Sequence, residues 1–208
     1  FLQDGARILK NAEEKLRLPI FVKPANMGSS VGVHKVKRWE DLSKALGDAF
    51  QYDLKVLIEQ GLDAREIEVA VLDGNPIFTS VASEIIANPK HEFYSYEAKY
   101  LDQEGAAVDL PAKLSSEQMV EIQSQAASVF TALECSAMAR VDFFLDRPSG
   151  KFYFNEVNTI PGFTAISMYP KMMEASGIPY SKLLSRLVDL ALERHKMKHK
   201  LKRDYSGD

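Results

Sequence analysis

Residues 137–158 constrain the fold more than any other part of the chain, because they form two strand-like runs joined by a short turn. The runs AMARVDFFLD and KFYFNEVN are rich in aromatic and β-branched residues, and RPSG between them is a turn sequence. If Asp142 lies opposite Glu156 in an antiparallel pair, the same register places Arg140 opposite Asn158, and all four side chains share one face. The segment therefore predicts a packed antiparallel hairpin with one polar face.

This polar face is interpreted as a metal site. Opposing Cβ atoms in such a pair lie about 4.5–5.5 Å apart, so ionised Asp142 and Glu156 would repel each other. A divalent cation removes the repulsion, and two carboxylates with the Asn158 carbonyl are hard oxygen ligands that Mg²⁺ takes together with phosphate oxygens. The alternative is a solvated sheet face. We favour the metal site because the other face is expected to be apolar, formed by Met138, Val141, Phe143, Leu145, Phe152, Phe154 and Val157.

The overall composition is that of an ordinary globular protein, with 46% hydrophobic and 26% charged residues among 208. The net charge of -3 gives no reason to expect nucleic acid as a partner. No run of about 18 apolar residues occurs, which predicts no membrane span. The basic stretch from Arg194 to Arg203 is interpreted as a solvated helix end and tail, rather than as an arm for nucleic acid or membrane.

Two single residues add to this description. Cys135 is the one cysteine, so an internal disulfide is excluded, and a reducing compartment is favoured. The first residue is Phe1 rather than Met, and the chain opens directly into a helical pattern. We therefore expect it to be a piece of a longer protein.

Hydrophobic periodicity and turn residues predict a mixture of helices and strands along the chain. Helices are expected over residues 4–17, 39–50, 115–134, 165–175 and 179–196. Further strands are expected over residues 18–24, 31–37 and 55–60, and as two runs around Asp73-Gly74-Asn75. Residues 88–113 predict a long loop, and such loops are usually functional or disordered. A change of composition near residues 59–65 suggests domains at 1–58 and 59–208.

The segment FVKPANMGSSVGV, residues 21–33, has the features of a phosphate-binding loop, although it is neither a Walker A nor a dinucleotide motif. Gly28 and Gly32 permit close backbone approach, Ser29 and Ser30 are donors, and Lys23 lies on the preceding strand. The alternative is an ordinary Gly-Ser hairpin tip. Phosphate binding is favoured because the same chain also carries the hairpin that is predicted to bind a metal ion.

The segment EFYSYEAKYL, residues 92–101, places three tyrosines and a lysine in the predicted long loop. It is interpreted as a lid in which Lys99 reaches phosphate, while Tyr94 and Tyr100 close the site against water. The alternative is a tyrosine-rich loop that packs on the surface.

Five segments taken together resemble one family. In chain order they are KPANMGSSVGV, IEQGLDAREIEVAVL, FYSYEAKY, ARVDFFL and NEVNTIPGFT. They are similar to the D-alanine–D-alanine ligases of the ATP-grasp superfamily, from about Leu18 to Ala191. The resemblance implies an α+β fold in which two subdomains with antiparallel or mixed sheets clamp ATP. It also implies that the amino-terminal domain of the family is absent here.

The resemblance implies roles for individual residues. The implied nucleotide contacts are Lys23, Gly28, Ser29, Ser30, Glu59, Gln60, Leu62, Glu66, Tyr94, Lys99 and Asn158. The implied ligands of two Mg²⁺ ions, which Mn²⁺ could replace, are Asp142, Glu156 and Asn158. The implied contacts of the acceptor D-alanine are Arg140, Gly162, Ser167 and Met168. The implied catalytic residues are Arg140, Ser29, Tyr100 and Lys99.

The implied activity is ATP-dependent ligation of two D-alanines through an acyl phosphate, for peptidoglycan precursor synthesis in the cytoplasm. The implied partners are D-alanine and ATP, with neither nucleic acid nor membrane, and the full-length protein is expected to be a homodimer. Without the amino-terminal domain, this chain is not expected to complete the reaction. Two alternatives are a D-alanine–D-lactate ligase, which Tyr100 disfavours, and a non-catalytic nucleotide-binding module, which intact metal ligands and Lys99 disfavour.

Overall fold

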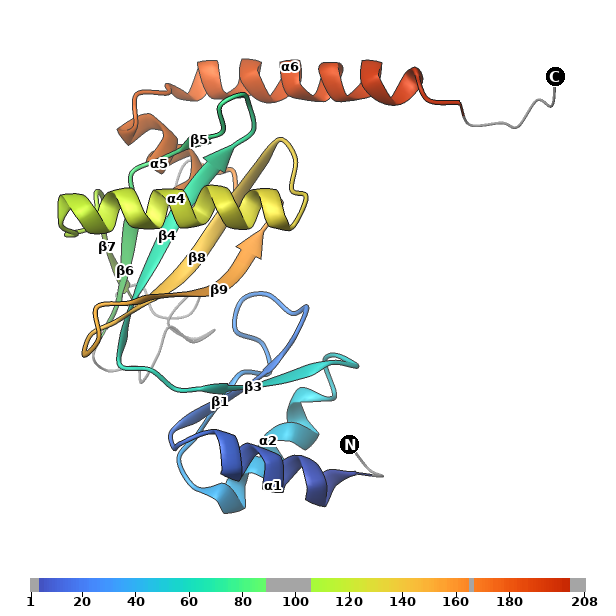
Figure 1. Cartoon of the computed structure of the whole chain (residues 1–208), viewed down its shortest axis with the longest axis vertical. Helices are drawn as coiled ribbons and strands as arrows, with labels where there is room; N and C mark the ends of the chain where they lie inside the picture. The colour runs from blue at the N-terminus through green and yellow to red at the C-terminus, as the bar shows by residue number, and fades with distance from the viewer. Residues whose placement is uncertain (1–3, 89–105, 165–166, 203–208) are drawn as a thin grey trace. The chain divides into compact units, whose positions relative to one another are not determined.

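The computed structural model describes residues 4–88, 106–164 and 167–202 (Figure 1). The chain divides into two compact units. The first unit comprises Phe1–Asp63 and Ala87–Ala107, and the second comprises Ala64–Ile86 and Val108–Asp208. Each unit has a hydrophobic core of its own. The division into domains at residues 58 and 59 stays a prediction.

The first unit is a three-stranded antiparallel sheet with helices packed on it. Its strands, in sheet order, are β2 (His34–Val36), β1 (Ile20–Pro24) and β3 (Val56–Gln60). Its helices are α1 (Gly5–Lys15), the 3-10 helix η1 (Trp39–Asp41) and α2 (Leu42–Ala49). The buried core is formed by Ala12, Ile20, Val22, Val36, Leu42, Ala45, Leu46 and Ala49.

The hairpin predicted from residues 18–24 and 31–37 is confirmed, although its second strand is shorter than expected. The reason is a pair of tight turns at the tip. The N–H groups of Val31 and Val33 donate to the carbonyls of Gly28 and Ser30, at 3.2 and 3.3 Å. These groups are therefore used within the loop, and the strand ladder begins only at His34.

The second unit is built around a six-stranded sheet (Figure 1). The order along the sheet is β7-β6-β4-β8-β9, with β5 paired to β4, and β4 pairs antiparallel with β5, β6 and β8. The strands are β4 (Ala64–Leu72), β5 (Phe78–Thr79), β6 (Ser83–Ala87), β7 (Ala106–Asp109), β8 (Met138–Asp146) and β9 (Phe152–Asn158). Antiparallel pairing with helices packed on the sheet confirms the predicted α+β class.

Two details of this sheet differ from the sequence prediction. The strand expected after Asp73-Gly74-Asn75 is split into β5 and β6. The Ala70 N–H donates a hydrogen bond of 2.9 Å to the Ser80 hydroxyl instead of to a backbone carbonyl, which interrupts the pairing with β4. The segment 88–113, predicted as a loop throughout, contains β7 beside β6. The loop prediction is therefore wrong for residues 106–109, while residues 89–105 lie outside the described chain.

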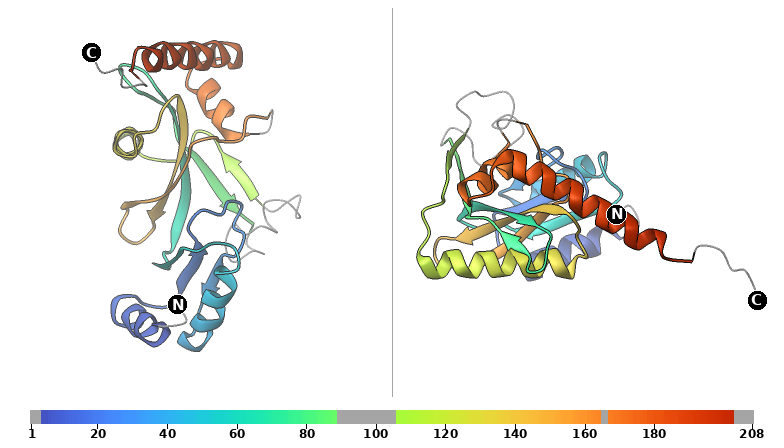
Figure 2. Two further views of the ribbon diagram at one scale, coloured as in Figure 1. Left: turned by 90° about the vertical axis from the view of Figure 1, so that its right-hand side faces the viewer. Right: turned by 90° about the horizontal axis from the view of Figure 1, so that it is seen from above.

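Helices cover both faces of the second sheet, as the edge-on view in Figure 2 shows. One face packs against α4 (Ser116–Ala132), and the other packs against α5 (Met168–Ala175) and α6 (Tyr180–His199). Helix α4 begins at a capping box, in which Ser115 Oγ accepts from the Gln118 N–H at 3.2 Å and Gln118 Oε1 accepts from the Ser115 N–H at 3.1 Å. Among the helices that the structure describes, none is both long and apolar enough to span a membrane.

Candidate functional site

The polar face of the β8–β9 hairpin has the predicted register. Asp142 lies opposite Glu156, and Arg140 lies opposite Asn158. The next strand extends the first of these rows, because Glu68 on β4 lies opposite Asp142, and Ser83 on β6 lies opposite Glu68. Four neighbouring strands thus carry Ser83, Glu68, Asp142 and Glu156 in one line across the sheet.

A β-bulge separates the polar and apolar parts of the hairpin. The register shifts between Asp142 and Phe143, because Phe143 pairs with Phe154 while Asp142 pairs with Glu156. Asn155 is the extra residue, so Phe154 and Phe152 turn to the face of Phe143, with ring centroids 6.2 and 6.5 Å from it. Strict alternation would have placed both rings beside Glu156 instead.

The predicted position of Met138 is wrong. Strand alternation places Met138 on the face of Arg140, since the two are separated by two residues. The structure packs Met138 against the core cluster of α5 and α6, whereas Val141, Phe143 and Leu145 belong to the cluster of α4. Both sheet faces are therefore covered around the polar residues, and the polar face is flanked by a second core.

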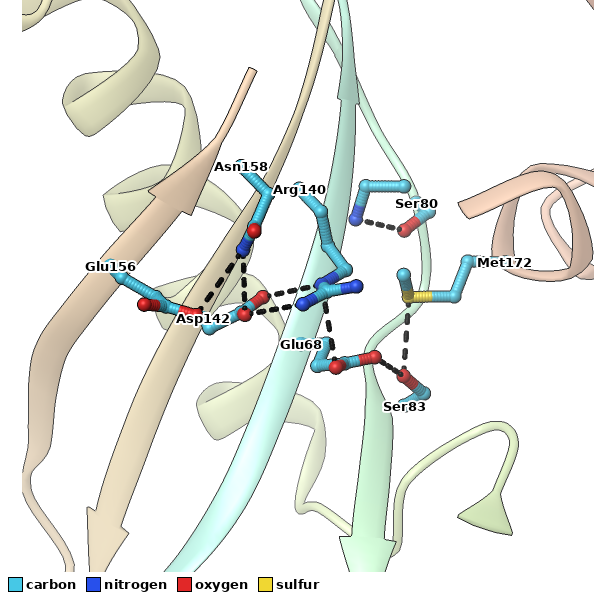
Figure 3. Close-up of polar contacts among 9 residues, drawn as sticks. Glu68, Ser80, Ser83, Arg140, Asp142, Glu156, Asn158 and Met172 are labelled. Carbon is cyan, nitrogen blue, oxygen red and sulfur yellow. Dashed lines mark hydrogen bonds and ion pairs between the residues drawn. The ribbon is translucent and has the colours of Figure 1, made fainter. Parts of the chain in front are cut away.

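The four polar side chains contact one another directly (Figure 3). The Arg140 Nε and Nη2 groups donate to the two oxygens of Asp142, each at 2.7 Å. The Asn158 amide donates to Asp142 Oδ2 at 3.0 Å and to Glu156 Oε1 at 3.5 Å. Donor groups thus lie between the two carboxylates and relieve the repulsion that the sequence predicted.

Glu68 completes the cluster and is a residue that the sequence analysis did not identify. Its Oε1 lies 3.3 Å from Arg140 Nε, and its Oε2 accepts from the hydroxyl of Ser83 at 3.3 Å. The residue is only 8% exposed. A signal was present in REIEVAVL, because a glutamate stands in the middle of a strand whose following residues are all apolar.

Burial and charge alter the titration of this cluster. Burial, followed by the negative charge of Asp142, raises the pKa of Glu68 to about 7, against the opposing effect of Arg140. Burial alone would lower the pKa of Arg140, but hydrogen bonds and charge from Asp142, and then the charge of Glu68, raise it above its ordinary value. The guanidinium therefore stays charged at any physiological pH.

The donor set fits a hard divalent cation. Asp142 and Glu156 supply carboxylates, and a half-turn of the Asn158 amide exchanges its Nδ2 for an oxygen ligand. Within the described residues, no group of three or more His, Cys, Asp and Glu side chains is arranged to hold a metal ion. A metal ion bound here would consequently need the amide oxygen and oxygen atoms of a ligand.

The acceptor segment predicted at residues 162–168 forms the entry to α5. Ser167 is the N-cap residue of this helix and Met168 is its first residue. The hydroxyl of Ser167 accepts from the Thr164 N–H at 3.0 Å, and a Cβ added to Gly162 would lie 2.9 Å from it. Gly162 thus leaves room for the Ser167 hydroxyl, and the first N–H groups of α5 form a positive helix end.

The nucleotide residues predicted on strands β1 and β3 lie together in the first unit. Lys23 Nζ forms an ion pair with Glu59 Oε2 at 2.8 Å. The side chain of Gln60 binds the backbone of Arg17, accepting from its N–H at 2.8 Å and donating to its carbonyl at 2.7 Å. Gln60 therefore holds the entry to β1, and Leu62 follows β3 in the connector to the second unit.

The predicted phosphate loop has the backbone of a specialised turn. Ser29 and Ser30 both have φ of 58°, and Gly32 has φ of 70°, in the left-handed region that L residues rarely adopt. Asp53, which the sequence reasoning missed, fixes the base of the loop, since its Oδ2 accepts from the N–H of Asn26 at 2.7 Å. Hydrogen bonds from the backbone of Lys55 and of Asn26 lower the pKa of Asp53.

Four further residues were predicted to contribute to the site, and the structure describes one of them. Glu66 lies on β4 opposite Phe144 and Ile85, two residues before Glu68 and on the same face. Tyr94, Lys99 and Tyr100 lie outside the described residues.

The chain matches the family model described as the D-ala D-ala ligase C-terminus over residues 2–189. It is 65% identical to D-alanine--D-alanine ligase A of Bradyrhizobium diazoefficiens, over 100% of this chain and 56% of the relative. The D-alanine-D-alanine ligase of Coxiella burnetii aligns with a TM-score of 0.76 at 38% identity, over 94% of this chain and 49% of that one.

The VanG D-Ala:D-Ser ligase of Enterococcus faecalis aligns with a TM-score of 0.81 at 36% identity, over 90% of this chain and 54% of that one. The chain thus spans about half the length of the curated relatives and solved structures that it matches. The predicted ATP-grasp fold is confirmed by these structural matches. This chain belongs to the family of D-alanine–D-alanine ligase carboxy-terminal regions.

Proposed function

We propose that this chain is the ATP-grasp part of an enzyme that joins two D-alanines to D-alanyl-D-alanine at the expense of ATP, for peptidoglycan precursors. The observation that carries the proposal is the polar row on β4, β8 and β9, where a charged arginine lies among three carboxylates and an amide. Family membership supports the same reaction. We further propose that the full-length protein acts in the cytoplasm as a homodimer on small molecules.

Most of the proposed nucleotide contacts belong to the first unit, whereas Glu66 and Asn158 belong to the second. Lys23 is a cation for phosphate, and Ser29 and Ser30 lie in a loop whose backbone groups suit close approach to phosphate oxygens. Glu59, now paired with Lys23, and the backbone of residues 60–62 would hold adenine. Glu66 would hold the ribose, and Tyr94 and Lys99 would complete the nucleotide site.

Asp142, Glu156 and Asn158 are the proposed ligands of two Mg²⁺ ions, for which Mn²⁺ is the alternative. When bound, such ions offset the negative charge of the ATP phosphates as the phosphoryl group is transferred. The surplus of negative side chains in the row supports this proposal, since Glu68, Asp142 and Glu156 outnumber the charge of Arg140.

The proposed reaction has two steps. The carboxylate of the first D-alanine attacks the γ-phosphorus of ATP, which forms an acyl phosphate and releases ADP. The amine of the second D-alanine then attacks the acyl carbon, and phosphate leaves as the peptide bond forms. Lys99 would stabilise charge on the transferring group, and Ser29 and Tyr100 would belong to a hydrogen-bond network around the substrates.

Arg140 is the proposed residue for the acceptor and for the oxyanion of the tetrahedral intermediate. Its Nε and Nη2 are engaged by Asp142, whereas Nη1 makes no hydrogen bond to any residue that the structure describes. Nη1 therefore has both N–H groups for a ligand oxygen. The helix end at Ser167 and Met168, with Gly162 beside it, supplies further backbone donors for the acceptor carboxylate.

The test is product analysis with the full-length protein. ATP and D-alanine are supplied alone, with D-lactate, or with D-serine, and released phosphate and condensed products are measured by mass spectrometry. We expect D-alanine-dependent phosphate release and D-alanyl-D-alanine as the main product in all three mixtures. A main product containing D-lactate or D-serine would show that this compound, and not D-alanine, is the preferred acceptor. Absence of D-alanine-dependent phosphate release would refute the ligase proposal.

A further inference from the structure

We propose that Glu68 is a positioning residue, which holds the Arg140 guanidinium together with Asp142 and connects it through Ser83 to helix α5. The proposal rests on the proposed function, because Arg140 and the start of α5 are the two proposed contacts of the acceptor. In this arrangement Glu68 sets the distance between them without touching a substrate itself.

The first argument is the placement of Glu68 in the fold. It lies on β4, between β6 and β8 in the sheet, and faces Ser83 on one side and Asp142 on the other. Its side chain is only 10% exposed. Burying a carboxylate so deeply costs free energy unless the group has charged and hydrogen-bonding partners, which here are Arg140 and Ser83.

The second argument is the way in which Arg140 is held (Figure 3). Asp142 binds the guanidinium through two hydrogen bonds of 2.7 Å, and Glu68 Oε1 approaches Nε at 3.3 Å. The residue of β4 directly opposite Arg140 is Ala70, whose methyl group leaves space for the arginine side chain. The guanidinium is therefore restrained by carboxylates from two strands, β4 and β8.

The third argument is that Asp142 has other contacts and another proposed role. It also accepts a hydrogen bond from Asn158 at 3.0 Å, and it belongs to the proposed cation ligands. Glu68 is not among those ligands, and its remaining oxygen is taken by Ser83. Its attraction for Arg140 thus does not compete with a second role.

The fourth argument is the connection to α5. The hydroxyl of Ser83 lies 3.3 Å both from Glu68 Oε2 and from the sulfur of Met172, a fully buried residue of α5. Helix α5 begins at Met168, next to Ser167. One carboxylate thus contacts Arg140 with one oxygen and, through Ser83, the helix whose first residues are proposed to bind the acceptor.

The test compares Glu68→Gln with the wild-type full-length enzyme, at a pH above about 8 so that Glu68 is ionised. Gln keeps the size and removes the charge. We expect the KM for the acceptor D-alanine to rise about tenfold, the lower range for losing an interaction with a charged group, while the KM for ATP stays unchanged. Glu68→Asp, which restores the charge, should recover part of the loss.

Glu84→Gln is the matched control. Glu84 is also a buried glutamate of the same sheet, and it binds Arg65 through two hydrogen bonds of 2.7 and 2.6 Å. Its strand partner Ile67 belongs to the cluster of α4, so Glu84 lies on the other face. This control should lower the Tm without changing the acceptor KM. An unchanged acceptor KM in folded Glu68→Gln, or an equal rise in Glu84→Gln, would overturn the proposal.

A second readout separates this proposal from the proposed function. The NMR signal of the Arg140 Nε–H group, assigned by its loss in Arg140→Lys, should shift in Glu68→Gln and remain in place in Glu84→Gln. If the wild-type protein released no phosphate with D-alanine, the ligase proposal would fail. The Arg140 signal would still test whether Glu68 positions the guanidinium. An Arg140 signal that is identical in wild type and Glu68→Gln would disprove the positioning.

Discussion

The substitution Asn158→Asp tests the proposed cation site without relying on activity. In the wild-type protein, the Asn158 amide donates to Asp142 at 3.0 Å and to Glu156 at 3.5 Å. Aspartate removes both donors and places a third carboxylate at the same distances. With a cation present, the same carboxylate becomes an additional hard ligand. The substitution should therefore destabilise the metal-free protein and strengthen its response to metal.

The expected magnitude follows from these contacts. A hydrogen bond to a charged group contributes about 1.5–3 kcal/mol, and two unit charges 3 Å apart repel by about 5 kcal/mol at an effective dielectric constant of about 20. The charge of Arg140, which binds Asp142 through two hydrogen bonds of 2.7 Å, offsets much of this repulsion, and Glu156 is exposed and can turn away. We expect a net loss of about 2–3 kcal/mol, or a fall in Tm of about 5–10 °C for a protein of this size.

The assay is thermal unfolding at a pH above about 8, where the new carboxyl is ionised, in EDTA and in excess MgCl2. Mg²⁺ should raise the Tm of Asn158→Asp by more than it raises that of the wild type. The control is Gln125→Glu on α4, which replaces an amide that donates to the Glu121 carboxylate at 2.9 Å in an exposed setting. That control should lose little stability and gain none from Mg²⁺. A wild-type Tm for Asn158→Asp in EDTA, or no extra response to Mg²⁺, would refute the reasoning.

Three further substitutions test the packing that supports the site, each by thermal unfolding. Gly61→Ala should cost about 1–3 kcal/mol, since its Cβ would lie 2.5 Å from the backbone oxygen of Pro19. Gly47→Ala, in α2 with no atom within 4 Å of the new Cβ, should instead stabilise by about 0.5–1 kcal/mol. Tyr169→Phe should cost about 1–2 kcal/mol, because its buried hydroxyl donates to the Val71 carbonyl at 3.0 Å. Reversed signs for the two glycines, or an unchanged Tm for Tyr169→Phe, would contradict the packing described.

The register of the β8–β9 hairpin was predictable, because the residue spacing allows Asp142 to face Glu156 only if Arg140 faces Asn158. The bulge at Asn155 was not predictable from alternation. Phe152, Phe154 and Glu156 are spaced by two residues, so regular alternation would place them on one face. The bulge allows Glu156 to lie on the polar face while both phenylalanines lie on the apolar face. A local pattern of period two contains no information about an inserted residue.

Residues that act through tertiary pairing were the hardest to find. Glu68 becomes part of the site only because β4 pairs with β8, and no local spacing relates residues so distant in the chain. Asp53 is comparable, since it fixes the proposed phosphate loop from a neighbouring turn. Strand β7 was missed because its four residues are too few to show a period. The features that local patterns did not predict are therefore those that depend on pairing between distant segments of the chain.

The most direct test of the account is D-alanine-dependent phosphate release from ATP by full-length Glu156→Gln. Glu156 is exposed and pairs across the sheet with Asp142, so the neutral amide should leave the fold and the Tm unchanged while removing the negative charge of one proposed cation ligand. We predict that phosphate release falls to the background measured without D-alanine. A correctly folded Glu156→Gln protein that releases phosphate at the wild-type rate would contradict the assignment of this hairpin as the catalytic centre.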